Sequence, residues 1–176
     1  MHRIVVTGPE STGKTTLARY LALQTGFPYV PEYAREYLQE RNGLYTEADL
    51  YNIARGQIDS ELFLHTNSPQ QPLIADTSLL VIKIWSEHKY GRCDSRIPEL
   101  LRAHPVDLYF LCAPDLPWVA DPLRENPGKG DYFFKWFERE LKDMNANYFI
   151  VKGIGEERQS RAFSQLKKWL QDHESL

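Results

Sequence analysis

Short apolar runs alternate along this chain with longer amphipathic stretches. The apolar runs are rich in β-branched and aromatic residues, and they predict strands at residues 3–8, 29–32, 72–75, 107–113 and 148–151. Between them, apolar residues recur every three or four positions, which predicts helices at residues 14–25, 34–38, 46–65, 79–85, 95–102, 132–144 and 157–169. This alternation predicts an α/β fold in which helices cover both faces of a five-stranded, mostly parallel sheet.

One stretch departs from the alternation. Residues 114–131 carry charges and are punctuated by proline and glycine, which is typical of a mobile lid rather than of a linker between domains. The 176 residues are the length of one domain, and they contain no internal repeat. We therefore expect a single domain over residues 1–176, with its lid at about 114–131.

Composition narrows the classes of partner. The chain is 42% hydrophobic and 26% charged with a net charge of −3, so it lacks the basic excess that nucleic acid or an anionic membrane would favour. No apolar stretch is long enough for a transmembrane helix or a secretory signal, which favours a cytoplasmic location. Cys93 and Cys112 lie far apart without metal-ligand spacing, and we expect both to be reduced thiols.

The segment from Gly8 to Thr15 (GPESTGKT) matches the P-loop pattern G-x-x-x-x-G-K-[ST] at every fixed position. The loop follows a predicted strand and opens a predicted helix, so backbone N–H groups and the helix N-terminus would face one phosphate. An ordinary glycine turn is the weaker interpretation. The residues expected to bind the nucleotide are Gly8, Glu10, Ser11, Thr12, Gly13, Lys14, Thr15 and Thr16, with Lys14 on the β- and γ-phosphates and Thr15 on Mg²⁺.

A P-loop site also needs an acid at the end of a neighbouring strand to hold the metal and its water. Asp76 directly follows an apolar run and is the best candidate, although it could instead cap the helix that begins nearby. Asp107 precedes its strand and would lie on the opposite edge of the sheet.

Three classes of P-loop protein compete. A GTPase would carry an N/T-K-x-D guanine-binding tetrad, and this sequence has none. An AAA-type motor would add a helical lid domain, for which the chain leaves little room. A small-molecule kinase needs an acceptor pocket, a base near the acceptor hydroxyl and a basic lid that excludes water.

The chain offers a candidate for each kinase part. Glu32 follows the second predicted strand and could accept the proton of a sugar hydroxyl, or be a solvated loop acid. Arg35 could stabilise the transferring phosphate, or pair with Glu36 or Glu32. On the lid, Arg124 with Lys129 could close over the phosphates, and a surface salt bridge is the alternative for Arg124.

Aromatic residues fall near the predicted edges of the pocket. Trp85, Trp118, Tyr33 and Tyr90 could present ring faces to a flat cationic ring through stacking and cation–π attraction. Core packing is the alternative for each of them. The loop within residues 148–158 is expected to lie under the adenine, or to be a plain turn from strand to helix.

Four segments together resemble the ribosylnicotinamide kinase domain of NadR-type proteins: GPESTGKTTLA, VPEYAREYL, ADTSLLVIKIW and APDLPWVADPLRE. The resemblance runs from about residue 4 to residue 162. It implies a three-layer P-loop kinase fold that uses Mg²⁺ and ATP to phosphorylate the 5′-hydroxyl of nicotinamide riboside, giving nicotinamide mononucleotide and ADP in NAD salvage.

The resemblance also assigns roles to residues. It implies that Lys14, Glu32, Asp76 and Arg124 are catalytic, with Thr15 and Asp76 on the metal, while either Glu32 or Asp76 is the general base. The acceptor would be bound by Glu32, Tyr33, Arg35, Trp85, Trp118 and Asp121, with either tryptophan stacking on nicotinamide.

Two departures from the family pattern affect the expectations. Lys129 is the only cation that closely follows Arg124, whereas family lids commonly carry further arginines. The adenylyltransferase and DNA-binding domains of some NadR-type proteins have no counterpart in this sequence, so we expect neither dinucleotide synthesis nor operator binding. A kinase for another nucleoside or nucleotide, or a regulatory ATPase acting on a partner protein, are the alternative functions.

Overall fold

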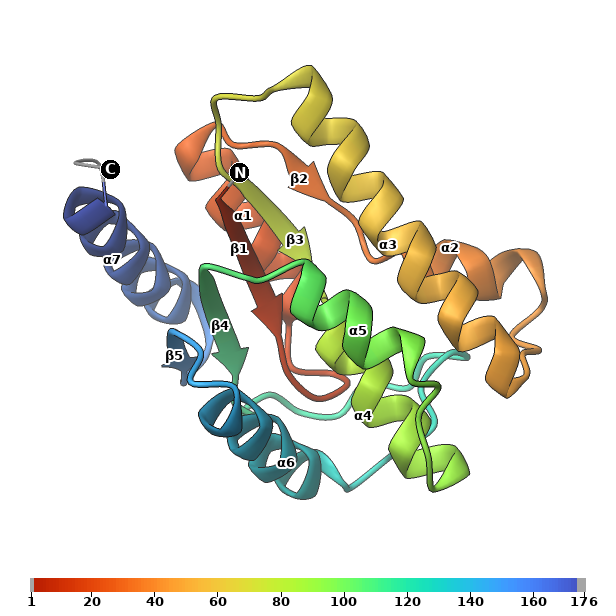
Figure 1. The fold of residues 1–176 in the computed structure, drawn as a ribbon. Helices are drawn as coiled ribbons and strands as arrows, with labels where there is room; N and C mark the ends of the chain where they lie inside the picture. Colours follow the sequence, from red (N-terminus) through yellow and green to blue (C-terminus); the bar gives the residue numbers. More distant parts are fainter. Residues whose placement is uncertain (1, 174–176) are drawn as a thin grey trace.

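A five-stranded parallel sheet forms the centre of the computed structural model, which describes residues 2–173 (Figure 1). Its strands are β1 (Arg3–Thr7), β2 (Tyr29–Val30), β3 (Leu73–Asp76), β4 (Leu108–Cys112) and β5 (Tyr148–Val151). They lie in the order β2-β3-β1-β4-β5, and every neighbouring pair is parallel. The predicted α/β class with its five-stranded sheet is confirmed.

Seven helices surround the sheet in two outer layers (Figure 1). They are α1 (Lys14–Thr25), α2 (Tyr33–Glu40), α3 (Glu47–Asn67), α4 (Leu79–Tyr90), α5 (Arg96–Ala103), α6 (Gly130–Asp143) and α7 (Gly155–His173). Side chains alternate between the two faces of a strand, so Ile4 and Val6 pack with α1 and α7 while Val5 packs with α4 and α6. A third cluster joins α2 and α5 to α3 and α4.

Element boundaries follow local chemistry. β2 ends after Val30, earlier than predicted, because Pro31 has no N–H to donate to a ladder. α3 begins at a capping box that Thr46 and Asp49 form. α4 continues five residues beyond its predicted end and stops at Gly91, which has the positive φ of 69° that glycine tolerates.

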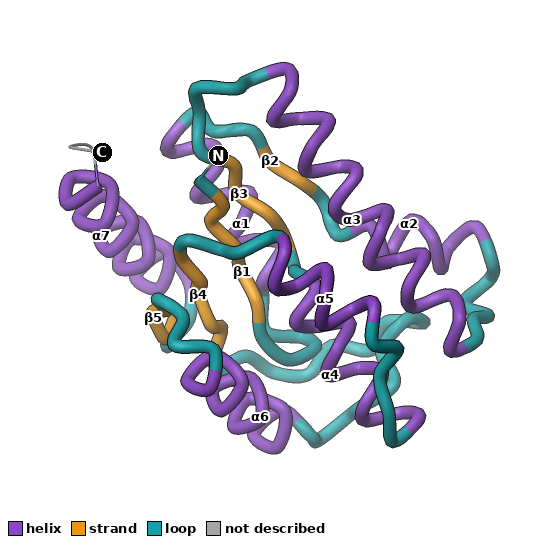
Figure 2. The backbone as a smooth tube through the Cα atoms, in the orientation of Figure 1, coloured by secondary structure: helices purple, strands orange, loops and turns teal. Residues whose placement is uncertain are grey.

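The carboxyl ends of the parallel strands meet at one edge of the sheet, as the arrowheads show (Figure 1). The P-loop leaves β1 there, Asp76 ends β3 there, and the lid begins there after β4. The lid crosses this edge as irregular chain (Figure 2) and ends directly before α6 starts at Gly130, two residues earlier than predicted. Asp107 lies at the opposite edge, as predicted, where its carboxylate accepts the Arg3 backbone N–H at 2.7 Å.

Neither cysteine forms a disulfide in the described chain: Cys112 is buried in β4 and Cys93 is partly exposed. Among residues 2–173, no helix has both the length and the apolar composition needed to cross a lipid bilayer.

Candidate functional site

The P-loop between β1 and α1 has the backbone geometry of an anion cradle. Gly8 has a φ of 134°, and a Cβ there would lie 2.7 Å from the carbonyl oxygen of Cys112 in β4. Gly13 and Ser11 also have positive φ, at 73° and 59°, and α1 begins directly afterwards at Lys14. These turns aim successive N–H groups and the positive end of α1 at one point, which is how such loops hold phosphate.

The loop is held in this shape from inside the protein by a residue that the sequence analysis did not single out. Arg158 of α7 is buried, and its Nη2 donates to the carbonyl oxygen of Thr12 at 2.7 Å. Its Nη1 donates to the carbonyl of Gly153 at 3.0 Å. Arg158 therefore ties the P-loop to the start of α7. The predicted adenine loop at 148–158 contains this arginine, but a GEER segment by itself indicates an exposed helix start.

Asp76 ends β3 beside Val6 of β1, directly below the P-loop. Its Oδ1 is buried without a hydrogen-bond partner, and its Oδ2 accepts from the Tyr29 hydroxyl at 3.4 Å. The helix-cap alternative is not what the structure has, because Ser78 caps α4 by accepting from the Leu80 N–H at 3.3 Å. A buried carboxylate oxygen with nothing to bind is expensive unless a ligand satisfies it.

Two threonine hydroxyls next to Asp76 share this condition. Thr7 Oγ1 and Thr77 Oγ1 are buried without partners, and Thr77 has a strained φ of 80°. Hard oxygen ligands and spare polar atoms suit Mg²⁺, which keeps several of its waters and needs few protein ligands. The described residues contain no cluster of three His, Cys, Asp or Glu side chains able to hold a metal alone.

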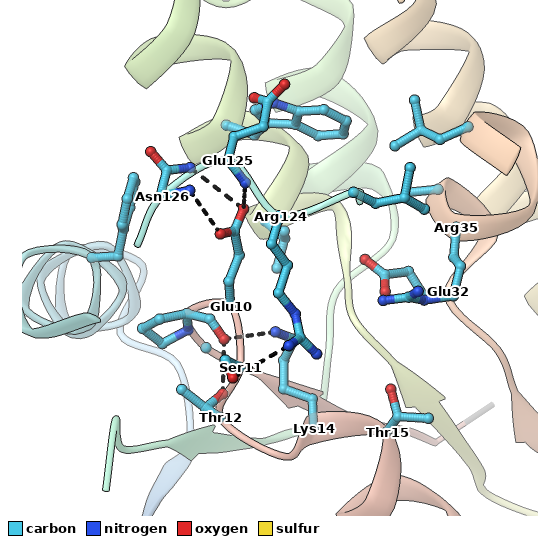
Figure 3. Close-up of a pocket in the computed structure, with 18 of the residues that line it drawn as sticks. Glu10, Ser11, Thr12, Lys14, Thr15, Glu32, Arg35, Arg124, Glu125 and Asn126 are labelled. Atoms are coloured by element: carbon cyan, nitrogen blue, oxygen red, sulfur yellow. Dashed lines mark hydrogen bonds between the residues drawn. The ribbon is translucent and has the colours of Figure 1, made fainter. Parts of the chain in front are cut away.

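A cavity of about 250 Å³ opens from the P-loop toward α2, α4, α6 and the lid (Figure 3). Its phosphate end is lined by Lys14, Thr15 and Thr16, and Glu32 stands at its side. Its far end is apolar and aromatic, and is lined by Leu38, Val81, Ile84, Trp85, Leu123, Phe133 and Phe137. One end of the cavity therefore suits phosphates and the other suits a flat ring.

Glu32 sits at the N-cap position of α2, where its side chain makes no capping hydrogen bond. Burial raises the pKa of its carboxyl group, the Lys14 ammonium opposes this, and the Asp76 carboxylate adds to it. A partly desolvated carboxylate that faces the phosphate end is placed to accept a proton there.

Arg35 has a different partner from the two acids that the sequence suggested. Its Nη1 lies 3.1 Å from Oδ2 of Asp121 in the lid, so the ion pair joins α2 to the lid. Asp121 also accepts the Leu123 N–H at 2.9 Å, and these contacts lower the pKa of its carboxyl group. Arg35 lines the cavity, whereas Asp121 and Tyr33 do not; the Tyr33 ring packs against Gly56 of α3.

The two candidate tryptophans lie in different places. Trp85 of α4 lines the cavity, and its Nε1 donates to the Tyr45 hydroxyl at 2.7 Å. Trp118 of the lid lines a separate hollow on the other side of the P-loop, where the Arg124 guanidinium lies 5.9 Å from its ring centroid. Tyr90 packs against the third hydrophobic cluster, which joins α2 and α5 to α3 and α4. The geometry thus brings Trp85, and not Trp118, to the apolar end of the cavity.

The lid is docked on the P-loop through Arg124 and Glu10 (Figure 3). Arg124 lines the cavity, and its Nη1 donates to Ser11 Oγ at 3.3 Å and to the carbonyl of Val119. The Glu10 carboxylate accepts the backbone N–H groups of Glu125 and Asn126 at 3.3 and 3.1 Å. The lid arginine therefore lies beside the P-loop, and its contact with the phosphates stays a prediction.

Lys129 does not join Arg124 there. Its Nζ lies 3.4 Å from Nε2 of His88 on α4, and Lys129 lines neither the cavity nor the hollow beside Trp118. Arg124 is therefore the lid cation that contacts the P-loop serine, and closure of Lys129 over the phosphates stays a prediction.

A parallel sheet, a P-loop after its central strand and an acid at the end of the adjacent strand together define a P-loop nucleotide-binding domain. A family model described as an AAA domain matches residues 3–158, and the chain belongs to this family of P-loop domains. The helical lid domain that an AAA-type motor would add is not present among residues 2–173. A search of curated proteins finds no match.

Solved structures of P-loop kinases share the fold. Two crystal structures of NadR match 95% of this chain. The structure in complex with NR has a TM-score of 0.77 at 23% identity, and the structure with NAD and AMP-PNP has a TM-score of 0.76 at 22% identity. The chain spans about half the length of these NadR chains (50% and 49%). The expected similarity to the NadR kinase domain is confirmed at the level of the fold.

Two other kinases match over nearly their whole length. A thymidylate kinase from Ehrlichia chaffeensis has a TM-score of 0.63 at 15% identity, covering 96% of this chain and 98% of that one. A deoxyadenosine kinase from M. mycoides with bound dATP has a TM-score of 0.61 at 12% identity, covering 95% and 100%. The three-layer P-loop kinase architecture is therefore that of this chain.

Proposed function

We propose that this protein transfers the γ-phosphoryl group of ATP to the 5′-hydroxyl of nicotinamide riboside, producing nicotinamide mononucleotide and ADP. The observation that carries the proposal is a single cavity that the P-loop, Glu32 and Trp85 all line. A flat cationic ring such as nicotinamide is attracted to an indole face. The fold is similar to that of NadR in its crystal structure with NR, which supports the same acceptor.

The roles of the residues follow from where they lie. Lys14 neutralises charge on the β- and γ-phosphates, and Arg124 adds a second cation from the lid. Thr15 and Asp76 would hold Mg²⁺, which supplies charge neutralisation for the phosphates when bound. As the 5′-oxygen bonds to the γ-phosphorus and the bond to the β-γ bridging oxygen breaks, Glu32 takes the hydroxyl proton. Asp76 is the weaker candidate base because its buried oxygen fits the metal.

An ADP-release assay with Mg·ATP and a panel of acceptors tests the proposal. The panel contains nicotinamide riboside, uridine, thymidine, adenosine and no acceptor, and we expect strong stimulation by nicotinamide riboside alone. The 5′-deoxy analogue of nicotinamide riboside is the matched control, because it keeps the ring and removes the accepting hydroxyl. Stimulation by a pyrimidine or purine nucleoside instead would mean that the acceptor is that nucleoside. ADP release at the same rate with every acceptor and with none would overturn the kinase function.

Glu32→Gln should lower kcat/KM for the acceptor by about ten- to 100-fold. This effect is small for the loss of a general base, because the hydroxyl proton needs to be only slightly removed in a loose phosphoryl-transfer transition state. In the wild-type enzyme, kcat/KM should fall as the pH drops through the pKa of Glu32. Because burial raises this pKa, the fall should begin above the usual carboxyl value of about 4.3. The pH–rate profiles of the wild type and the variant measure both effects.

Glu36→Gln is the matched control, since Glu36 is an exposed acid on the same helix. It should leave both the rate and the acidic limb unchanged. Thermal melting separates a loss of catalysis in Glu32→Gln from a loss of activity through misfolding. The pKa of Glu32 is raised in the folded state, so the stability that this group contributes is present at low pH and is lost as the pH rises. Glu32→Gln should therefore melt no lower than the wild type at neutral pH. An unaltered profile in this variant would point to Asp76 as the base.

A further inference from the structure

The Tyr45 hydroxyl lies where three segments meet at the roof of the cavity. Tyr45 belongs to the loop between α2 and α3, and it lines the cavity beside Trp85. Its oxygen accepts from Trp85 Nε1 at 2.7 Å and from Lys89 Nζ of the same helix at 2.5 Å. It donates to Glu125 Oε2 of the lid at 2.9 Å, and Lys89 also donates to Glu125 Oε1 at 2.9 Å.

The directions of these hydrogen bonds leave no freedom. An indole N–H and an ammonium can only donate, and a carboxylate can only accept. The phenolic oxygen of Tyr45 thus accepts from Trp85 and Lys89, and its one proton goes to Glu125. Burial, with a smaller contribution from the Glu125 carboxylate, raises the pKa of Tyr45 to about 12, so this proton stays in place throughout the neutral range.

Glu125 connects this group to the phosphate end of the cavity. Its backbone N–H donates to Glu10 of the P-loop, while its carboxylate holds Tyr45 and Lys89. Trp85 itself is oriented by the hydrogen bond to Tyr45 and by an edge-on contact in which the two ring centroids lie 4.7 Å apart at 64°. If Glu125 withdraws, the Tyr45 hydroxyl proton loses its acceptor. The hydroxyl group is then no longer fixed, and neither is the hydrogen bond by which it orients the Trp85 indole.

We propose that Tyr45 is a positioning residue that couples closure of the lid to the orientation of the Trp85 indole, and so to binding of the acceptor ring. This inference rests on the proposed acceptor site at the apolar end of the cavity. In the closed lid, Glu125 fixes Tyr45, Tyr45 fixes Trp85, and Trp85 presents its ring to the acceptor.

The first test needs no acceptor. With ¹⁵N-labelled indole nitrogens, the Trp85 N–H resonance is assigned by its loss in Trp85→Phe. We expect Tyr45→Phe and Glu125→Ala to shift this resonance and to speed its exchange with water, although Glu125 does not contact Trp85. Asp115→Asn is the matched control, because this lid carboxylate accepts the Gly153 N–H and lies outside the group. An unmoved Trp85 resonance in Glu125→Ala overturns the coupling.

The second test is a double-mutant cycle with whichever nucleoside the panel shows to be phosphorylated. Tyr45→Phe should raise the acceptor KM about five- to tenfold, the scale of one cation–π contact, and leave kcat within about twofold. In the Trp85→Phe background the same change should raise KM by less than about twofold. An equal rise in both backgrounds means that Tyr45 acts alone, and the inference fails. If no nucleoside is phosphorylated, the proposed function fails, and the resonance test decides the coupling by itself.

Discussion

Lys14→Ala should lower kcat for phosphoryl transfer about 100-fold or more. Its ammonium is the P-loop cation at the phosphate end of the cavity, and loss of one preorganised electrostatic contact costs about 100- to 1000-fold in rate. Lys14 Nζ donates to the carbonyl of Pro9 at 2.7 Å, so the ammonium is held within the P-loop. Steady-state kinetics at saturating Mg·ATP measure the effect.

Lys168→Ala is the control, because Lys168 is an exposed lysine of α7 that lies far along the chain from the P-loop. It should keep wild-type turnover. Thermal melting of both variants shows whether they fold alike. Near-normal turnover in Lys14→Ala would mean that the P-loop assignment is wrong.

Arg3→Met should lower the free energy of unfolding by about 3–5 kcal/mol, because it leaves a buried carboxylate without its cation. Arg3 begins β1 and is 2% exposed, and Glu61 of α3 is 1% exposed. Arg3 Nε donates to Glu61 Oε2 at 2.7 Å, and Nη1 donates to the carbonyls of His104 and Pro105. Urea unfolding followed by circular dichroism measures the loss.

An exposed ion pair provides the comparison. Arg92 Nη2 and Glu47 Oε2 lie 2.6 Å apart, but the Arg92 side chain is 75% exposed, so Arg92→Met should cost far less than Arg3→Met. Arg3→Met/Glu61→Leu should recover part of the lost stability, because it removes the uncompensated charge. Equal costs for Arg3→Met and Arg92→Met would show that burial does not set the strength of the inner pair.

Hydrogen bonds also connect the buried pair of Arg3 and Glu61 to the candidate functional site. Glu61 Oε1 accepts from Gln57 Nε2 at 3.2 Å, and Gln57 Oε1 accepts the Tyr33 backbone N–H at 3.0 Å. Tyr33 follows Glu32 directly, so a chain of buried hydrogen bonds runs from the start of β1 to the start of α2. We expect Arg3→Met to disturb the position of Glu32 as well as the stability of the sheet.

Local patterns predicted the elements well because strands and helices have short periods. The segment at 14–25 was predicted with the same limits that α1 has, and its buried residues Leu17, Ala18, Leu21 and Ala22 have helical spacing. The segment at 95–102, predicted as a short helix, is one residue out of step with α5. Only two of the four residues predicted for the second strand pair with β3, because Pro31 cannot donate.

The parts of the site that lie in one continuous segment of sequence could be predicted. The contacts between residues far apart in the sequence could not. Lys14 and Thr15 belong to one loop, and Asp76 needs only a strand end. The pairing of Arg35 with Asp121 joins residues 86 positions apart, and the contact of Arg158 with Thr12 joins residues 146 positions apart. No local spacing encodes either contact.

The P-loop, the parallel sheet and the acid at the end of β3 could all be predicted from short segments of sequence, because these features depend on glycine conformations, on the period of apolar residues and on the residue at a strand end. The folded structure was needed to show that Trp85 rather than Trp118 lines the cavity, that Lys129 contacts His88, and that Tyr45 joins α4 to the lid. Those outcomes depend on how the lid and the helices pack around one another, which chain distance does not reveal.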